Sequence, residues 1–338
     1  KQYLQSGNFT QNNFFLPNRT IWIEKINDRA LRGVPFFLFI DYEMKNPLLV
    51  EADQLEEENI HIHFPSYQSK DPQTNHLQPL IHPHPISFER YQQSFRYVQQ
   101  QLHYGNSYLC NLTVQTPLEL NGTLSDIYML SRAQYKILFM DEWVCFSPEQ
   151  FISIQGNQIH TFPMKGTIDA SIPDAENKIL NDPKEKAEHY TIVDLLRNDL
   201  SLVASDVKVV SFRDIQRIHT SAKTLLQVSS HIQGTLPPDF RSRLGELIFS
   251  LLPAGSISGA PKISTMKIIH EAEHYTRGFY TGTAYYYNGS DLDSCVLIRF
   301  IEKTDSGYVY KSGGGITIHS RAEDEYREIN DKIYVPLI

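Results

Sequence analysis

Strand-like segments joined by short turns are the feature that most limits the folds open to this chain. The segments "VLIRFIE" (296–302) and "GYVYKS" (307–312) are close enough in sequence to predict an antiparallel pair across a turn. Further strand-like segments lie at 107–116, 135–146 and 151–162, and we expect the last two to pair. Because parallel strands need long crossover connections, this spacing favours an α+β fold over a regular βαβ alternation.

Two helices are predicted to carry carboxylates beside an apolar stripe. The first begins within "NDPKEKAEHYTIVDLLRND", where Asp182 suits the N-cap and Glu185 completes a capping-box pattern. In that register Glu188, Ile192 and Leu195 lie at i, i+4 and i+7 on one face, and Glu185 borders it. A buried carboxylate needs a partner, so Glu188 is either one half of a salt bridge or a metal ligand.

The C-terminal segment "HSRAEDEYREINDKIYV" repeats this arrangement. Ser320 and Glu323 form a second capping-box pattern, and Glu325, Glu328 and Lys332 lie at i, i+3 and i+7. Solvated surface charge is the usual explanation of such a run. Two helices that each offer paired glutamates are also typical of an oxygen-only Mg²⁺ site, and the helices alone leave both explanations open.

A run of three glycines predicts an anion-binding segment. Gly313, Gly314 and Gly315 follow a strand-like stretch in "KSGGGIT", although a plain hairpin has no need of three consecutive glycines. Their N–H groups can converge on a carboxylate. Arg299, in the middle of an apolar strand, is the matching bidentate partner, with a structural salt bridge as the alternative.

One lysine stands between chain-breaking residues in "TFPMKGT" (161–167). Lys165 is either a solvated charge at a loop tip or an amine held in a cleft as a nucleophile. The local sequence does not decide between these two interpretations.

Charge and composition exclude several classes of protein. The net charge of −8 leaves no basic excess for a nucleic-acid backbone, and the longest apolar run, "VPFFLFI", is a buried strand rather than a membrane span. Three scattered cysteines indicate reduced thiols and a cytoplasmic protein. The Pro-, Gln- and His-rich stretch 65–86 predicts a linker that ends a short N-terminal region, residues 1–86, before an amphipathic helix at 88–102. Residues 87–338 would then form the catalytic domain.

Nine motifs in collinear order over roughly residues 88–335 resemble the chorismate-utilising enzymes. That family includes anthranilate synthase component I, aminodeoxychorismate synthase component I, isochorismate synthase and salicylate synthase. The matching motifs are "GNSYLCNLT", "FSPEQF", "PMKGT", "EKAEHYTIVDLLRNDL", "PAGSISGAPK", "TGTAYYY", "VLIRF", "SGGGI" and "EDEYREINDK". The resemblance implies two packed β-sheets flanked by helices, with chorismate and Mg²⁺ in a deep cleft.

The resemblance also implies a role for individual residues. The metal ligands would be Glu188 and Glu328, supported by Glu185 and Glu325. The general acid that helps the C4 hydroxyl of chorismate to leave would be Glu149. The substrate contacts would be Thr167, Tyr286, Arg299, Lys332 and the amides of Gly313, Gly314 and Gly315.

Two positions favour the aminating branch of the family, that of aminodeoxychorismate synthase. Its members usually carry lysine where Lys165 stands, as the nucleophile that attacks C2, whereas anthranilate synthases carry alanine there. The isochorismate and salicylate enzymes place a lysine where Leu109 stands. Gln227 departs from the family, which usually has histidine at that position.

The resemblance also implies partners for this chain. Ammonia would come from a separate glutamine amidotransferase subunit, because no cysteine of this chain lies in a Gly-x-Cys-x-Gly turn. Anthranilate synthase component I is the nearest alternative, and isochorismate or salicylate synthase a more remote one. A silent binding subunit and a Mg²⁺-dependent phosphate hydrolase are disfavoured by the complete motifs and by the absence of a nucleophilic Asp motif.

Overall fold

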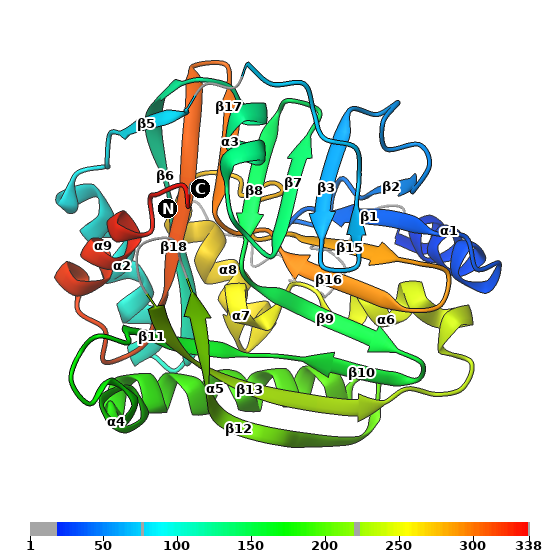
Figure 1. Ribbon diagram of the computed structural model, residues 1–338. Coiled ribbons are helices and arrows are strands. Elements are labelled where there is room, and N and C mark those ends of the chain that lie inside the picture. Colours follow the sequence, from blue (N-terminus) through cyan, green and yellow to red (C-terminus); the bar gives the residue numbers. More distant parts are fainter. Residues whose placement is uncertain (1–18, 76–77, 220–223, 337–338) are drawn as a thin grey trace, which may run out of the picture.

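Two antiparallel β-sheets pack together to form the body of the molecule, with helices against them (Figure 1). The computed structural model describes residues 19–75, 78–219 and 224–336. Within these residues each sheet has nine strands. The predicted α+β class and the two packed sheets are confirmed.

The first sheet carries Lys165 on its edge strand. Its strands in spatial order are β11 (Met164–Asp169), β13 (Thr224–Thr235), β10 (Gln158–Thr161), β9 (Gln150–Gln155), β16 (Leu292–Val296), β15 (Thr283–Tyr287), β1 (Phe36–Ile40) and β2 (Leu48–Glu51), with β12 (Ser205–His219) also paired to β13.

The second sheet carries the glycine run. Its strands in spatial order are β14 (Gly259–Ala260), β6 (Leu109–Asn121), β18 (Gly307–Ile316), β17 (Phe300–Thr304), β8 (Trp143–Ser147), β7 (Tyr135–Phe139), β3 (Ile60–Phe64) and β4 (Tyr67–Gln68), with β5 (Leu80–Pro83) also paired to β6.

The helices divide between the two sheets. Helix α5 lies along β11, β12 and β13, helices α2, α8 and α9 contact β6 or β18, and α1 packs against α6. In the described part of the chain the helices are α1 (Arg19–Leu31), α2 (Phe88–His103), α3 (Leu124–Leu130), α4 (Ala175–Asn181), α5 (Pro183–Ser201), α6 (Leu244–Leu251), α7 (Gly255–Ser258), α8 (Lys262–Glu273) and α9 (Ala322–Asp331), besides a 3₁₀ turn (Phe240–Arg243). None of these helices is long and apolar enough to cross a membrane.

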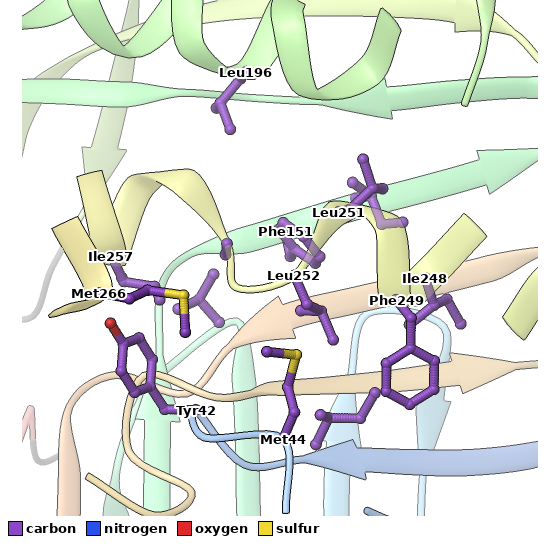
Figure 2. Packing of buried hydrophobic residues seen from close by; sticks show 14 of the residues in the cluster. Tyr42, Met44, Phe151, Leu196, Ile248, Phe249, Leu251, Leu252, Ile257 and Met266 are labelled. Carbon is purple, nitrogen blue, oxygen red and sulfur yellow. The ribbon is translucent and has the colours of Figure 1, made fainter. Parts of the chain in front are cut away.

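Strand β1 shows why its sequence is apolar at every position. Successive side chains of a strand point to opposite faces. Phe37 and Phe39 belong to the core between the two sheets, whereas Phe36, Leu38 and Ile40 belong to the core under the helices. Figure 2 shows part of the core under the helices. The strand is buried on both faces, as "VPFFLFI" predicted.

Several predicted elements differ from the structure in their pairing or extent. The segments 135–146 and 151–162 do not pair with each other, because each folds into its own hairpin and the two hairpins lie in different sheets. The C-terminal helix begins at Ala322, so Ser320 is not its N-cap, and its hydroxyl accepts a hydrogen bond from the Thr317 N–H instead. The N-cap at Asp182 is confirmed, since its carboxylate accepts the Glu185 N–H at 2.9 Å.

Segments before residue 87 contribute to both sheets. Strands β1 and β2 extend the first sheet, and β3 and β4 extend the second. Within the expected linker, Leu80–Pro83 forms β5 and pairs with β6. The amphipathic helix predicted at 88–102 is α2, capped by the Ser87 hydroxyl.

A buried ion pair joins helix α8 to the second sheet. Arg277 and Glu273 are each 1% exposed, and their Nη2 and Oε1 atoms lie 2.6 Å apart. Glu273 also accepts the Thr113 N–H from β6 at 2.8 Å. Arg277 donates to the carbonyl oxygens of Asn111 and Ile257 at 2.7 and 2.9 Å. The pair therefore fixes three separate chain segments at one point.

We expect Arg277→Leu to destabilise the fold strongly, because it leaves the buried Glu273 carboxylate without its cation. The free energy of unfolding, measured by urea titration, should fall by about 3–5 kcal/mol. The matched control is Arg327→Ala, which breaks the exposed pair with Asp324 on α9 and should cost less than about 1 kcal/mol. Equal losses in the two variants would contradict this account.

Candidate active site

One cavity of about 450 Å³ gathers most of the predicted site residues. It is bounded by β11, the first turns of α5, α7, the glycine run of β18 and the C-terminal end of α9. All the predicted residues line it except Tyr286 and Glu325. Helix α5 therefore meets the glycine strand and α9, which come much later in the sequence, at a single place.

Lys165 occupies a β-bulge rather than a loop tip. Met164 pairs with Ser229 and Thr167 with Gln227, so Lys165 and Gly166 together stand opposite the single residue Val228. Gly166 has a φ of 82°, a conformation that glycine adopts without strain. The bulge directs the Lys165 side chain into the cavity wall, where it is 28% exposed and its Nζ lies 3.6 Å from Glu188 Oε2.

Glu149 lies at the same cavity, between β8 and β9. Its Oε1 accepts a hydrogen bond from the Ser256 hydroxyl at 2.6 Å. Burial raises the pKa of the Glu149 carboxyl, although Ser256 and the cations Lys165, Arg299 and Lys332 oppose that rise. A raised pKa is what a carboxyl needs in order to donate a proton.

The four glutamates approach one another across α5 and α9. Lys184 Nζ lies 3.8 Å from Glu188 Oε1 and 3.5 Å from Glu325 Oε1, so one ammonium bridges the two helices. Burial and the neighbouring Glu188 carboxylate raise the pKa of Glu185. Burial likewise raises the pKa of Glu325, which is only 2% exposed and lies behind the cavity wall. This excess of carboxylates favours a bound cation.

The donor set fits a hard divalent cation in its chemistry, because all its ligands are carboxylate oxygens. Among the described residues, however, no three acidic, histidine or cysteine side chains already form a metal-binding group. Lys184 occupies the position between the helices, and Lys332 Nζ holds Glu328 Oε1 at 2.8 Å. Both ammonium groups show that cations are accommodated beside these carboxylates.

The three glycines lie inside β18, not after a strand as predicted. Gly313 of β18 stands opposite Thr113 of β6. The Gly313 carbonyl accepts a hydrogen bond from Lys332 Nζ, and the Thr113 N–H donates to Glu273. The Gly313 carbonyl and the Thr113 N–H therefore point away from each other, and these two groups form no bond between β6 and β18. Groups of residues two apart point the same way in a strand. Gly313 and Gly315 therefore direct their N–H groups toward the cavity, and two amides rather than three consecutive ones are available to an anion.

Arg299 lies between two strands rather than within one. Strand β16 ends at Val296 and β17 begins at Phe300, so residues 297–299 cross from the first sheet to the second. Arg299 has a φ of 56°, a strained conformation that clusters at functional sites. Its guanidinium lies over the ring of Tyr334 at 5.3 Å. Within the described part of the chain it forms no ion pair with a carboxylate, which favours an external anion over a structural salt bridge.

Tyr286 is a correction to the predicted substrate contacts. It stacks on Phe37 with ring centroids 4.6 Å apart and lines a different cavity, at the far end of β15. Tyr280, six residues earlier, lines the main cavity instead and is buried. Tyr286 was assigned from the resemblance to the family alone, and no pattern in the sequence singles out Tyr280.

Other cavity residues were also missed. Lys184 stands four residues before Glu188, a helical spacing from which the pairing can be foreseen. Ser256 lies within the quoted motif "PAGSISGAPK", but the sequence gives no sign that it meets Glu149. Gln227, which departs from the family histidine, does line the cavity opposite Thr167.

Comparison with known proteins agrees with this geometry. The family model described as chorismate binding enzyme matches residues 6–337. The chain belongs to the chorismate-binding enzyme family. It is 46% identical to an uncharacterized PabA-like protein of Pasteurella multocida over 94% of this chain and 98% of that protein.

More distant members of the family are also similar. Aminodeoxychorismate synthase component 1 of Escherichia coli K12 is 31% identical over 72% of this chain, which spans 56% of that protein's length. The menaquinone-specific isochorismate synthase MenF of Escherichia coli has the same fold, with a TM-score of 0.69 and 15% identity over 93% of this chain and 80% of that one. The chain is thus a chorismate-utilising enzyme whose sequence is close to aminodeoxychorismate synthase component I.

Two adjacent glycine substitutions separate structural from functional roles in β18. A Cβ on Gly313 would lie 2.5 Å from the Thr113 side chain, so Gly313→Ala should lower the free energy of unfolding by about 1–3 kcal/mol. A Cβ on Gly314 would lie 3.5 Å from Glu325 Oε2 and 3.8 Å from Glu328 Oε1, which is ordinary contact. The free energy of unfolding of Gly314→Ala should therefore stay within about 1 kcal/mol of the wild-type value. The variant should nevertheless bind chorismate more weakly in a calorimetric titration, because Gly314 lines the cavity and the added methyl group takes up space there. Unchanged binding in a stable Gly314→Ala protein would contradict the placement of the site.

Proposed function

We propose that this chain is component I of aminodeoxychorismate synthase and aminates chorismate at C4, keeping the pyruvyl group. The observation that carries the proposal is the surroundings of Gly315. A Cβ placed there would lie 3.9 Å from Lys165 Nζ and 3.2 Å from Leu109 Cδ1. An amine and an apolar side chain thus flank the same point of the cavity. Lys165 can act there as a nucleophile, whereas Leu109 cannot act as a base that activates water for attack.

In the proposed reaction Lys165 and Glu149 divide the work between nucleophile and acid. The neutral Lys165 amine attacks C2 of chorismate, the two conjugated ring double bonds shift, and the C4–O bond breaks. Glu149 gives its proton to the departing hydroxyl, which leaves as water. Ammonia then adds at C4, both double bonds shift back, and the C2–N bond breaks to release the lysine amine.

Substrate orientation would come from the cationic wall and the metal. Arg299, Lys332 and the N–H groups of Gly313 and Gly315 line the part of the cavity suited to the carboxylates of chorismate. Glu188 and Glu328, supported by Glu185 and Glu325, would hold Mg²⁺. When bound, that ion would bind the ring carboxylate of chorismate and offset its negative charge.

The proposal includes a source of ammonia and a pathway. Cys110, Cys145 and Cys295 are all buried, so none of them can serve as an exposed glutaminase nucleophile. A separate glutamine amidotransferase subunit would therefore supply ammonia, and the product would enter para-aminobenzoate and folate synthesis in the cytoplasm. Anthranilate synthase is the second candidate, since its members share the fold, but Lys165 departs from its pattern.

Removal of the Lys165 amine tests the nucleophile. Lys165→Ala should lower kcat for amination by roughly 10²-fold or more, with residual turnover from direct attack by ammonia. Lys165→Arg should do no better, because a guanidinium stays charged and cannot attack. Chorismate without ammonia should leave a mass adduct on the wild-type peptide that contains Lys165.

The control for this test is Lys186→Ala, which removes an exposed lysine of α5 and should leave the rate unchanged. If Lys165→Ala aminates chorismate at the wild-type rate, Lys165 is only a charged residue of the cavity wall. Amination through a lysine adduct would then lose its main support.

The pH profile tests the acid. Because Glu149 acts in its protonated form, kcat/KM should decline as pH rises through its raised pKa. The Ser256 hydrogen bond lowers that pKa, so Ser256→Ala should move the declining limb to higher pH. Ser264→Ala, at a half-buried position of α8 that does not line the cavity, should leave the limb in place. A shift to lower pH in Ser256→Ala would exclude Glu149 as the acid.

Single ligand changes test the metal. Glu188→Gln and Glu328→Gln should each raise the Mg²⁺ concentration for half-maximal rate by at least about tenfold, and weaken binding of Mn²⁺ measured directly by electron spin resonance. Glu323→Gln, an exposed change on the same α9 helix, should do neither. Full activity of Glu188→Gln at limiting Mg²⁺ would exclude this ligand assignment.

A further inference from the structure

A second and much smaller cavity adjoins the main one behind Lys165 and Glu149. Its volume is about 70 Å³, and it shares Glu149, Met164, Lys165 and Ser256 with the main cavity. These four residues line both spaces, and we call them the mouth of the smaller one. We call the smaller space the side chamber.

The walls of the side chamber combine apolar and polar side chains. Phe151 of β9 and Ile192 and Leu196 of α5 line it, and all three are buried. Figure 2 shows Leu196 pointing away from its helix toward the layer that carries Phe151. The polar wall residues away from the mouth are already bonded, since the Thr161 hydroxyl donates to the Phe151 carbonyl and the Gln150 amide donates to Asp293.

Size decides what the side chamber can hold. A cavity needs only about 10–15 Å³ of such volume to admit one water. The chamber therefore has room for one or a few molecules of that size, whereas a ring with two carboxylates needs the main cavity. A nitrogen nucleophile held there has to be neutral, because an ammonium ion has no free electron pair with which to attack.

We propose that the side chamber holds the neutral ammonia that attacks chorismate. This inference rests on the proposed amination. The chamber presents ammonia at the mouth, beside the amine that must leave and the carboxylate that has just lost its proton. As the N–C4 bond forms and the C2–Nζ bond breaks, the electron pair returns to Lys165 Nζ. One proton of the attacking nitrogen passes to Glu149 and restores the acid for the next cycle.

Filling and enlarging the chamber test its role. Leu196→Phe should raise the KM for ammonium by about tenfold or more, because the nucleophile loses its position, while the KM for chorismate stays within about twofold. Leu196→Ala should admit methylamine and give a methylated product, recognised by mass, that wild type does not form. Leu200→Ala is the matched control, since Leu200 is buried one turn further along α5 and does not line the chamber.

The outcomes separate this inference from the function it rests on. If wild type forms no amino product, both proposals fall. If wild type aminates chorismate but Leu196→Phe keeps the wild-type KM for ammonium, the chamber is a packing defect and only this inference falls. Should Leu196→Phe fail to fold, the methylamine test decides alone: equal use of methylamine by Leu196→Ala and Leu200→Ala overturns the proposal.

Discussion

The buried pair of Glu273 and Arg277 is the interaction on which the cavity depends. Arg277 bonds Asn111, Ile257 and Thr281, and all three of these residues line the main cavity. An unpaired charge at this depth is costly, so the pair holds β6, α7 and the turn before β15 in one fixed arrangement. The cavity wall is therefore positioned from behind by a charge pair that itself remains outside the cavity.

Two cations of the cavity, Lys165 and Arg299, lie where the regular pairing of the strands is interrupted. The crossing at residues 297–299 and the bulge at Lys165 and Gly166 both interrupt regular pairing, and each brings a cation to the cavity. The glycine run leaves one edge of β18 open, so backbone amides are available as well. Irregular backbone, held by regular sheets on either side, thus supplies two cations of the cavity, whereas helices α5 and α9 supply its carboxylates.

Local sequence patterns predicted the helices and strands but not how these elements pair and pack with one another. The helix at 88–102, the N-cap at Asp182 and the strand pair β17–β18 follow from periodicity and caps within short windows. The bulge at Lys165 and the separation of the two hairpins depend on pairing with distant strands, which no short window contains. The place of Tyr286 could not be predicted for the same reason, because its stacking on Phe37 depends on pairing with a strand far away in the sequence.

The central claim is that this cavity aminates chorismate and keeps the pyruvyl group. The most direct measurement is product identification by mass spectrometry after incubation of the purified chain with chorismate, Mg²⁺ and ammonium. The account predicts 4-amino-4-deoxychorismate, with no release of pyruvate. Anthranilate together with pyruvate, or isochorismate formed by attack of water, would contradict it.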